Sequence, residues 1–172
     1  MNDLLSLGAR AGKGEIWYAA GMEIGSPIAG LGPDLDQSLR AIVAHFHAQI
    51  GTIHTLESDG MLHMRAHTPG IPDAVLAATQ VIPIGKGIAG LAGERRAPVN
   101  LCNLQQDKSG DVRPGARATG AMGSLCVPML SGEQAVGALG IAAMGERNFT
   151  DDEVAALLEM GKALAQHVVR RA

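Results

Sequence analysis

The segment 85–90, Gly-Lys-Gly-Ile-Ala-Gly, has the spacing G-x-G-x-x-G of a loop that cradles the pyrophosphate of a dinucleotide. Such a loop needs a strand before it, a helix after it and then a second, parallel strand. Here the motif lies in mid-chain, behind a predicted hairpin, and Pro83 weakens the short strand that precedes it. The phosphate-loop motif fails as well, because Leu91 and Ala92 stand where Lys and Ser or Thr are required. The glycines therefore favour a tight turn into a helix, whose first N–H groups near Gly87 could still bind an anion or a carbonyl.

Two histidines could face each other on neighbouring strands. If Leu56 pairs with Met61 in the predicted hairpin, His54 lies directly opposite His63, and two such imidazoles can reach one metal ion. No third ligand is evident in the sequence, and surface histidines are common, so we expect no metal site.

The segment 103–120 is polar, rich in glycine and long for a loop, which is typical of functional or mobile segments. It carries the cations Lys108, Arg113 and Arg117, with Asp107 and Asp111 as possible partners. One interpretation is that this loop binds a small anionic or polar metabolite. The alternative is a solvated loop without a ligand.

Composition limits the classes of function. The chain has 172 residues, which suits one domain, and only 2% of them are aromatic. Lys and Arg number 14 against 17 Asp and Glu, so a net charge of −3 and few aromatic side chains argue against nucleic-acid binding. No apolar run approaches the roughly 20 residues of a membrane span, and no signal peptide is recognisable. We therefore expect a cytoplasmic protein without a membrane partner, whose cysteines, Cys102 and Cys126, are thiols.

The hydrophobic spacing predicts the elements that must position these residues. A helix is expected over 33–46, because apolar residues recur there at helical spacing. A long final helix is expected to start at the capping box Thr150 to Glu153, with Phe149 and Val154 at the staple positions. The other predicted elements are a hairpin of 50–57 and 61–68, a short helix over 72–80, an extended piece over 81–84, a helix over 87–96, a strand over 98–102, and a second hairpin of 123–130 and 135–144. A helical turn near Ala116 is a further possibility.

This order is helix, hairpin, helix-rich crossover, hairpin and long helix, which predicts an α+β fold with a mostly antiparallel sheet. In the strand 61–68, Leu62, Met64 and Ala66 alternate with polar residues, which predicts one apolar face and one wet face. Both strands of the second hairpin are nearly all apolar or small, so both of their faces should be covered.

Five short motifs in this order resemble the GAF domain, a small sensory module common in bacterial signalling and in cyclic-nucleotide phosphodiesterases. They are G-x-G-x-x-G, Ala97-Pro98 before a strand, 124-SLCVPM-129, 137-GALGI-141 and the F-T-D-D-E start of the last helix, and they span about residues 33–170. The resemblance implies a central antiparallel sheet of about six strands. Both terminal helices would pack on one face, and short helices and loops would roof a ligand pocket on the other.

The resemblance also implies where a ligand would bind. In nucleotide-binding members, backbone groups at the positions of Ile88 and Ala89 touch the ligand, and the loop equivalent to 103–120 closes over it. The candidate binding residues are therefore Gly87, Ile88, Ala89, Asp107, Arg113, Arg117, Thr119 and Ser124. No cofactor is expected.

One enzyme of the family, a reductase of free methionine sulfoxide, requires a thiol that attacks the sulfoxide sulfur and another that resolves the product. Its cysteine positions correspond here to Ala89 and to the region of Arg117, whereas Cys126 lies where the enzyme has an apolar residue. We therefore expect a chain without catalytic activity, and Cys126 is expected to be a small core residue.

The resulting hypothesis is a GAF domain over 32–172 that binds a small molecule and signals through a separate protein or by self-association. The alternative is an interaction module without a ligand, and a remote alternative is an enzyme similar to the methionine sulfoxide reductase. In that alternative a homodimer would form through the stripe from Val154 to Val168, with Gly161 allowing close approach, and through residues 1–31. That N-terminal arm could be a helix, an extra strand or a covering segment.

Overall fold

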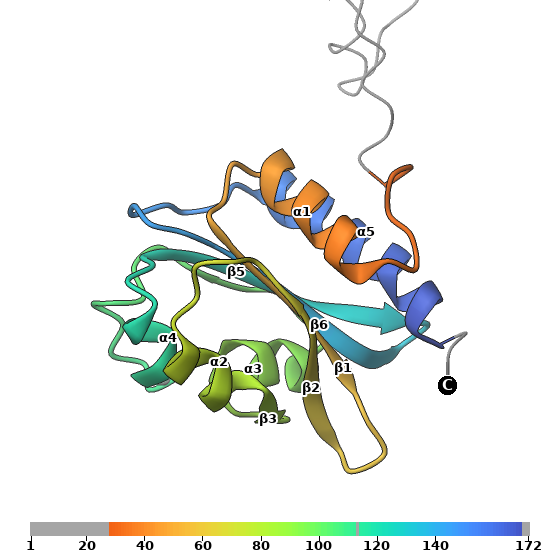
Figure 1. Cartoon of the computed structure of the whole chain (residues 1–172), viewed down its shortest axis with the longest axis horizontal. Helices are drawn as coiled ribbons and strands as arrows, with labels where there is room; N and C mark the ends of the chain where they lie inside the picture. The colour runs from red at the N-terminus through yellow and green to blue at the C-terminus, as the bar shows by residue number, and fades with distance from the viewer. Residues whose placement is uncertain (1–27, 113, 170–172) are drawn as a thin grey trace, which may run out of the picture.

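In the computed structural model, which describes residues 28–112 and 114–169, an antiparallel sheet separates two layers of helices (Figure 1). The strands are β1 (Ile50–Leu56), β2 (Met61–His67), β3 (Val81–Pro83), β4 (Val99–Leu101), β5 (Gly123–Ser131) and β6 (Gln134–Ala143), in the order β3-β2-β1-β6-β5-β4. One face is covered by α1 (Leu35–His45) and α5 (Asp151–Val169), and the other by α2 (Asp73–Thr79), α3 (Gly87–Arg95) and α4 (Pro114–Ala118). The predicted α+β fold with terminal helices on one face is confirmed.

The two terminal helices begin where side chains satisfy their first N–H groups. Asp34 caps α1 and accepts a hydrogen bond of 2.9 Å from the N–H of Gln37, so this helix begins after Asp34 and not at Pro33. At α5 the predicted capping box is present. The N–H of Thr150 donates to the Glu153 carboxylate at 2.9 Å, and the N–H of Glu153 donates to Thr150 Oγ1 at 3.3 Å.

Arg147 joins these two helices. Its guanidinium donates to the carbonyl of Phe46 at 2.6 Å, pairs with the Glu153 carboxylate, and lies over the ring of Phe149 at 4.4 Å from the centroid. Partial burial acts to raise the pKa of Glu153, but the hydrogen bonds from Thr150 and Arg147 outweigh it and hold that pKa below its ordinary value.

The main hydrophobic core lies between the sheet and the terminal helices. It is built largely from Leu, Ile, Val and Met side chains with the rings of Phe46 and Phe149. A Cβ added at Gly161 would lie 3.1 Å from the carbonyl oxygen of Pro128, so the absence of a side chain lets α5 lie close against β5. The buried residues of the stripe from Val154 to Val168 therefore pack within this chain, and a homodimer through the terminal helices stays a prediction.

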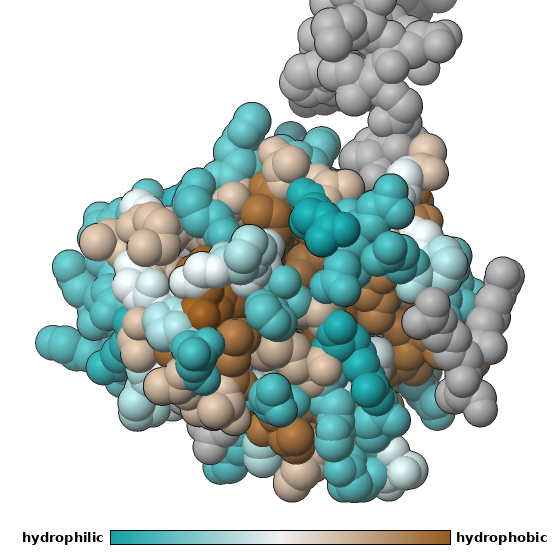
Figure 2. Space-filling model, in the orientation of Figure 1, coloured by the Kyte–Doolittle hydropathy of each residue, from teal (hydrophilic) through white to brown (hydrophobic). Residues whose placement is uncertain are grey.

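Exposed apolar side chains are scattered over the described surface. The large ones, Ile28, Met61, Val81, Met144 and Val169, are 36–47% exposed. On the face shown in Figure 2, hydrophobic residues form separate areas between hydrophilic ones.

No helix among the described residues is long and apolar enough to cross a membrane. The first 27 residues of the predicted N-terminal arm lie outside the described part of the chain, and Leu31 packs against the core.

A β-bulge in β2 changes which residues share a face. Ile53 pairs with Ala66, but the next residue of β1, His54, pairs with Met64, so Arg65 is an extra residue on β2. Ala66 consequently packs in the core under the terminal helices, whereas Leu62 packs on the opposite face of the sheet. The expectation that Leu62, Met64 and Ala66 form one apolar face is therefore wrong.

The glycine motif forms the start of a crossover. Gly85 and Gly87 have φ values of 76° and 64°, which favour glycine, and they turn the chain from β3 into α3. A Cβ at Gly90 would lie 2.4 Å from the carbonyl oxygen of Pro83, so Gly90 lets α3 pack against the preceding strand. Helix α3 connects the two edge strands of a sheet whose paired strands are all antiparallel. The dinucleotide interpretation is thereby excluded, since it needs two parallel strands.

Candidate functional site

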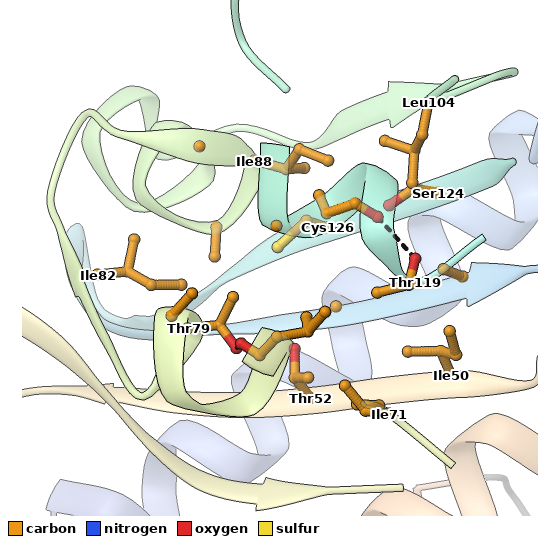
Figure 3. A pocket seen from close by; sticks show the side chains of 18 of the residues that line it. Ile50, Thr52, Ile71, Thr79, Ile82, Ile88, Leu104, Thr119, Ser124 and Cys126 are labelled. Carbon is orange, nitrogen blue, oxygen red and sulfur yellow. Dashed lines mark hydrogen bonds between the residues drawn. The ribbon is translucent and has the colours of Figure 1, made fainter. Parts of the chain in front are cut away.

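A pocket of about 470 Å³ lies between the sheet and the three short helices (Figure 3). Its floor is formed by β1, β5 and β6, and its roof by α2, α3, α4 and the loops beside them. The lining residues are Ile50, Thr52, His54, Ile71, Val75, Ala78, Thr79, Ile82, Gly87, Ile88, Ala89, Leu104, Pro114, Gly115, Ala116, Thr119, Ser124, Cys126, Gly140, Ile141 and Ala142. Pockets of this size bind small molecules in many proteins.

Small residues of β6 create the hollow in the floor. Gly140 pairs with Thr52 of β1 on one side and with Cys126 of β5 on the other, and Ala142 pairs with Ile50 and Ser124 in the next row. Because side chains alternate along a strand, the large residues Leu139 and Ile141 belong to the core under the terminal helices. The pocket exists because the central strand presents almost no side chain on this face.

The roof is closed by contacts between short helices. A Cβ added at Gly115 of α4 would lie 3.7 Å from the Cβ of Ala78 in α2, so these two helices nearly touch above the floor. Ile88 of α3 packs with Leu104 and Ala116 in a small apolar cluster at one end of the pocket. The roof therefore consists of short segments joined by limited apolar contacts.

His54 is the one imidazole that lines the pocket within the described chain. It is 2% exposed, and its Nε2 lies 2.9 Å from the carbonyl oxygen of Thr79. Because a carbonyl only accepts, Nε2 carries the proton, and Nδ1 is a buried acceptor without a partner among the described residues. Burial lowers the pKa of His54 below 6.5, and the bond to Thr79 opposes this only in part.

This burial predicts a dependence of stability on pH. Above pH 6.5 His54 is neutral in both states, whereas below it the unfolded chain binds the proton more readily, so acid destabilises the fold. We compare wild type with His54→Gln, which keeps an N–H donor but does not titrate, by thermal unfolding from pH 8 to pH 5. The stability of wild type relative to the variant should fall by up to about 1.4 kcal/mol per pH unit below pH 6.5. A constant difference would show that His54 does not titrate differently in the two states.

The two cysteines lie in different environments. Cys126 is buried and lines the pocket beside Ser124 on β5. Burial raises the pKa of its thiol to about 12, in spite of a hydrogen bond with the Val127 backbone, so it is protonated at neutral pH. Cys102 is exposed and is not part of the pocket lining.

The structure brings together five of the eight predicted binding residues. Gly87, Ile88, Ala89, Thr119 and Ser124 all line the pocket. They come from two separate segments, the glycine motif and the region around the start of β5, which the fold places on either side of one cavity.

Asp107 and Arg117, which were also predicted as binding residues, do not line the pocket. The exposed guanidinium of Arg117 donates to the backbone carbonyl of Asp107 at 2.6 Å, and the Asp107 carboxylate accepts from Ser109 Oγ at 2.7 Å. These contacts fasten the loop to α4 on its outer side. Arg113 lies outside the described residues.

The predicted pairing of His54 with His63 is also wrong. The hairpin pairs Leu56 with Leu62 and not with Met61, which places His54 opposite Met64 and His63 opposite Thr55. His63 Nε2 lies 2.8 Å from the Asp59 carboxylate near the hairpin turn. This contact is exposed, whereas the ring of His54 is buried. In residues 28–112 and 114–169 no three His, Cys, Asp or Glu side chains gather in a metal-binding group.

Sequence reasoning missed the lining contributed by β1, α2 and β6, including Thr52, Val75 and Gly140. One signal was present: in 138–142 small residues alternate with Leu139 and Ile141. Such alternation indicates a strand with one packed face and one face left hollow, whereas the roof residues of α2 carry no comparable pattern.

Comparison with known proteins places this geometry in a family. A family model described as GAF domain matches residues 35–169. The GAF domain of an Acinetobacter phosphoenolpyruvate-protein phosphotransferase is similar in structure, with a TM-score of 0.68 and 18% identity over 83% of this chain and 86% of that one. The corresponding domain from Coxiella burnetii has a TM-score of 0.66 and 22% identity, covering 81% and 84% of the two chains.

A catalytic protein shares the fold as well. The free methionine-R-sulfoxide reductase of Neisseria meningitidis, solved with its substrate, has a TM-score of 0.65 and 17% identity over 84% of this chain and 80% of its own. No curated protein matches the chain. At these identities the solved structures establish the fold alone, while the family model covers most of the sequence. With its six-stranded antiparallel sheet, its paired terminal helices and its roofed pocket, this chain belongs to the GAF domain family.

Proposed function

We propose that this chain is a regulatory GAF domain that binds one small molecule in the pocket and has no catalytic activity of its own. The observation that carries the proposal is the pocket itself, about 470 Å³ in volume and lined mainly by apolar side chains. Of the roof helices, α2 buries only Val75 and α4 buries no residue, so a ligand that fills the cavity would stabilise the arrangement of these two helices. That shift in population is the signal that a separate protein would read.

The environments of the two cysteines support the absence of sulfoxide reduction. Reduction of a sulfoxide by a protein thiol needs a thiolate, because the thiolate is the nucleophile. Burial raises the pKa of the Cys126 thiol to about 12, so this thiol is protonated at pH 7. Cys102, the other cysteine, is exposed and does not line the pocket.

Gly140→Leu provides the test, because it fills the floor of the pocket. A Cβ at this position meets Thr52 Oγ1 at 3.4 Å and Cys126 Sγ at 3.6 Å, which are ordinary contacts, so the strand accepts a side chain that projects into the cavity. The neutral fluorophore N-phenyl-1-naphthylamine should bind wild type with enhanced emission and should lose at least about tenfold in affinity in the variant. Ala155→Leu adds the same side chain on the exposed side of α5 and should leave binding unchanged.

Native mass spectrometry of freshly purified protein complements this titration. A retained small molecule should add a discrete mass to wild type and to Ala155→Leu, but not to Gly140→Leu, and should dissociate on denaturation. Circular dichroism confirms that the variants fold, and Gly140→Ala replaces the larger variant if it does not. Equal fluorophore binding by all variants would refute the pocket as a binding site. Turnover of free methionine-R-sulfoxide with a thiol reductant would refute the absence of catalysis.

A further inference from the structure

Four hydroxyl groups line the pocket, and two of them are already used by the backbone. Thr79 Oγ1 donates to the carbonyl of Val75 at 2.8 Å, which satisfies it within α2. Thr119 Oγ1 donates to the carbonyl of Ala116 at 2.6 Å and accepts from the N–H of Ala121 at 3.1 Å (Figure 3). These two hydroxyls fold the roof and have little capacity left for a ligand.

The other two hydroxyls, those of Thr52 and Ser124, have no hydrogen-bond partner among the described residues. Ser124 is only 7% exposed and Thr52 is half-buried, yet both side chains line the pocket. Both hydroxyl oxygens keep some accessible surface. Because the two side chains line the pocket, this surface faces the cavity. A polar group in such a place is unfavourable unless water or a ligand satisfies it.

The sheet register fixes how these hydroxyls are arranged. Thr52 pairs with Gly140 and Ser124 with Ala142, so they stand on the two strands that flank β6, one two-residue step apart. Two strand spacings and one such step separate their Cα atoms by roughly 12 Å. Figure 3 shows Thr52 and Ser124 on opposite sides of the space that Cys126 and Ile88 also border. Between them the floor offers only Gly140 and Ala142.

Charge is the remaining constraint. Among the described residues that line the pocket, none has an acidic or basic side chain, apart from the imidazole of His54. An ion that entered would lose its hydration without meeting a counterion. Among the described residues of the lining, the positive end of the α3 dipole at Gly87 is the feature that would favour an anion. The test below compares the affinity of a charged probe with that of a neutral one.

We propose that the pocket takes an uncharged, largely apolar molecule whose neutral carbonyl or hydroxyl oxygens are bound by the hydroxyls of Thr52 and Ser124. This inference rests on the pocket being a ligand site, as proposed above. Hydroxyls both donate and accept, so they match neutral oxygen groups without requiring a charge. The anionic metabolite suggested by the loop cations is replaced here by a neutral one.

Three matched probes test the proposal: 2-acetylnaphthalene, 2-isopropylnaphthalene and 2-naphthoate. They differ only in whether the substituent carries a neutral oxygen, no oxygen or a charged carboxylate. Each competes with N-phenyl-1-naphthylamine for the full-length chain. We expect wild type to bind the ketone about tenfold more tightly than the hydrocarbon, because only the ketone accepts a hydrogen bond. The carboxylate should also bind about tenfold more weakly than the ketone, because its charge must be desolvated in the pocket.

Variants show which side chains cause the preference for the ketone. In the double variant Thr52→Val, Ser124→Ala the ketone should bind no better than the hydrocarbon, while the affinity for the hydrocarbon stays within twofold of wild type. Ser131→Ala removes a hydroxyl from the same strand outside the pocket and should keep the preference. The single variants then show which hydroxyl the ketone uses.

Other outcomes overturn the inference in recognisable ways. Equal affinity for ketone and hydrocarbon in wild type, or a preference that survives in the double variant, would show that the hydroxyls do not select the ligand. Carboxylate binding as tight as ketone binding would show that the end of α3 governs the site. If the fluorophore itself binds equally to wild type and Gly140→Leu, the pocket proposal fails and not merely the identity of its ligand.

Discussion

Gly137→Ala should destabilise the protein by about 3 kcal/mol or more, the largest effect we expect from adding a single methyl group. An added Cβ would lie 2.3 Å from the carbonyl oxygen of His54 and 3.2 Å from the Met129 sulfur. The first of these atoms belongs to the backbone of β1, the strand paired with β6, and it cannot rotate away. Relief would require the two central strands to separate. Urea unfolding monitored by circular dichroism measures the loss.

Gly140→Ala is the matched control on the same strand. Its Cβ meets only Thr52 and Cys126 side-chain atoms, at 3.4 and 3.6 Å. Because alanine also restricts the unfolded chain, this variant should lie within about 1 kcal/mol of wild type. Similar losses at the two positions would mean that β1 and β6 approach each other differently from the arrangement described.

Phe149→Ala should cost about 3–5 kcal/mol, because it removes a large ring from the main core. Phe149 is 2% exposed, and its backbone carbonyl accepts a hydrogen bond of 2.7 Å from Asn100 Nδ2, which holds the turn before α5. The substitution empties the space over which Arg147 lies. Phe149→Leu, which keeps much of the apolar volume, should cost clearly less.

A double-mutant cycle separates the ring's packing from its contact with the guanidinium. Arg147→Met keeps an unbranched apolar side chain, and its coupling to Phe149→Leu should be about 0.5–2 kcal/mol. Urea unfolding of the four proteins gives this coupling directly. Strict additivity would show that Arg147 stabilises the fold only through Phe46 and Glu153.

The fold was largely predictable because its elements carry local signals. The capping box at Thr150, the polar turns at 58–60 and 131–134 and the helical spacing in 33–46 all depend on neighbouring residues in the sequence. The bulge at Arg65 does not. It arises from the pairing of β2 with β1 and β3, and no residue in 61–68 marks it. The partner of His54 was missed for a different reason, because the hairpin pairs Leu56 with Leu62 and not with Met61.

The site was predictable mainly where a motif marks it. Gly87, Ile88 and Ala89 belong to the glycine motif, whereas Thr52 is a single threonine in a strand and becomes a pocket residue through the strand order alone. Arg117 lies outside the pocket for a related reason. A charged side chain in a polar loop can reach inward or outward, and backbone carbonyls on the outer side of the loop satisfy it.

The alternation along β6 separates two tasks that share one strand. Leu139 and Ile141 pack in the main hydrophobic core, whereas Gly140 and Ala142 line the pocket and set its volume. Side chains on the second set can grow or shrink without disturbing the packing under α1 and α5. Graded substitutions at 140 and 142 should therefore change the volume of the pocket while the scaffold that surrounds it stays the same.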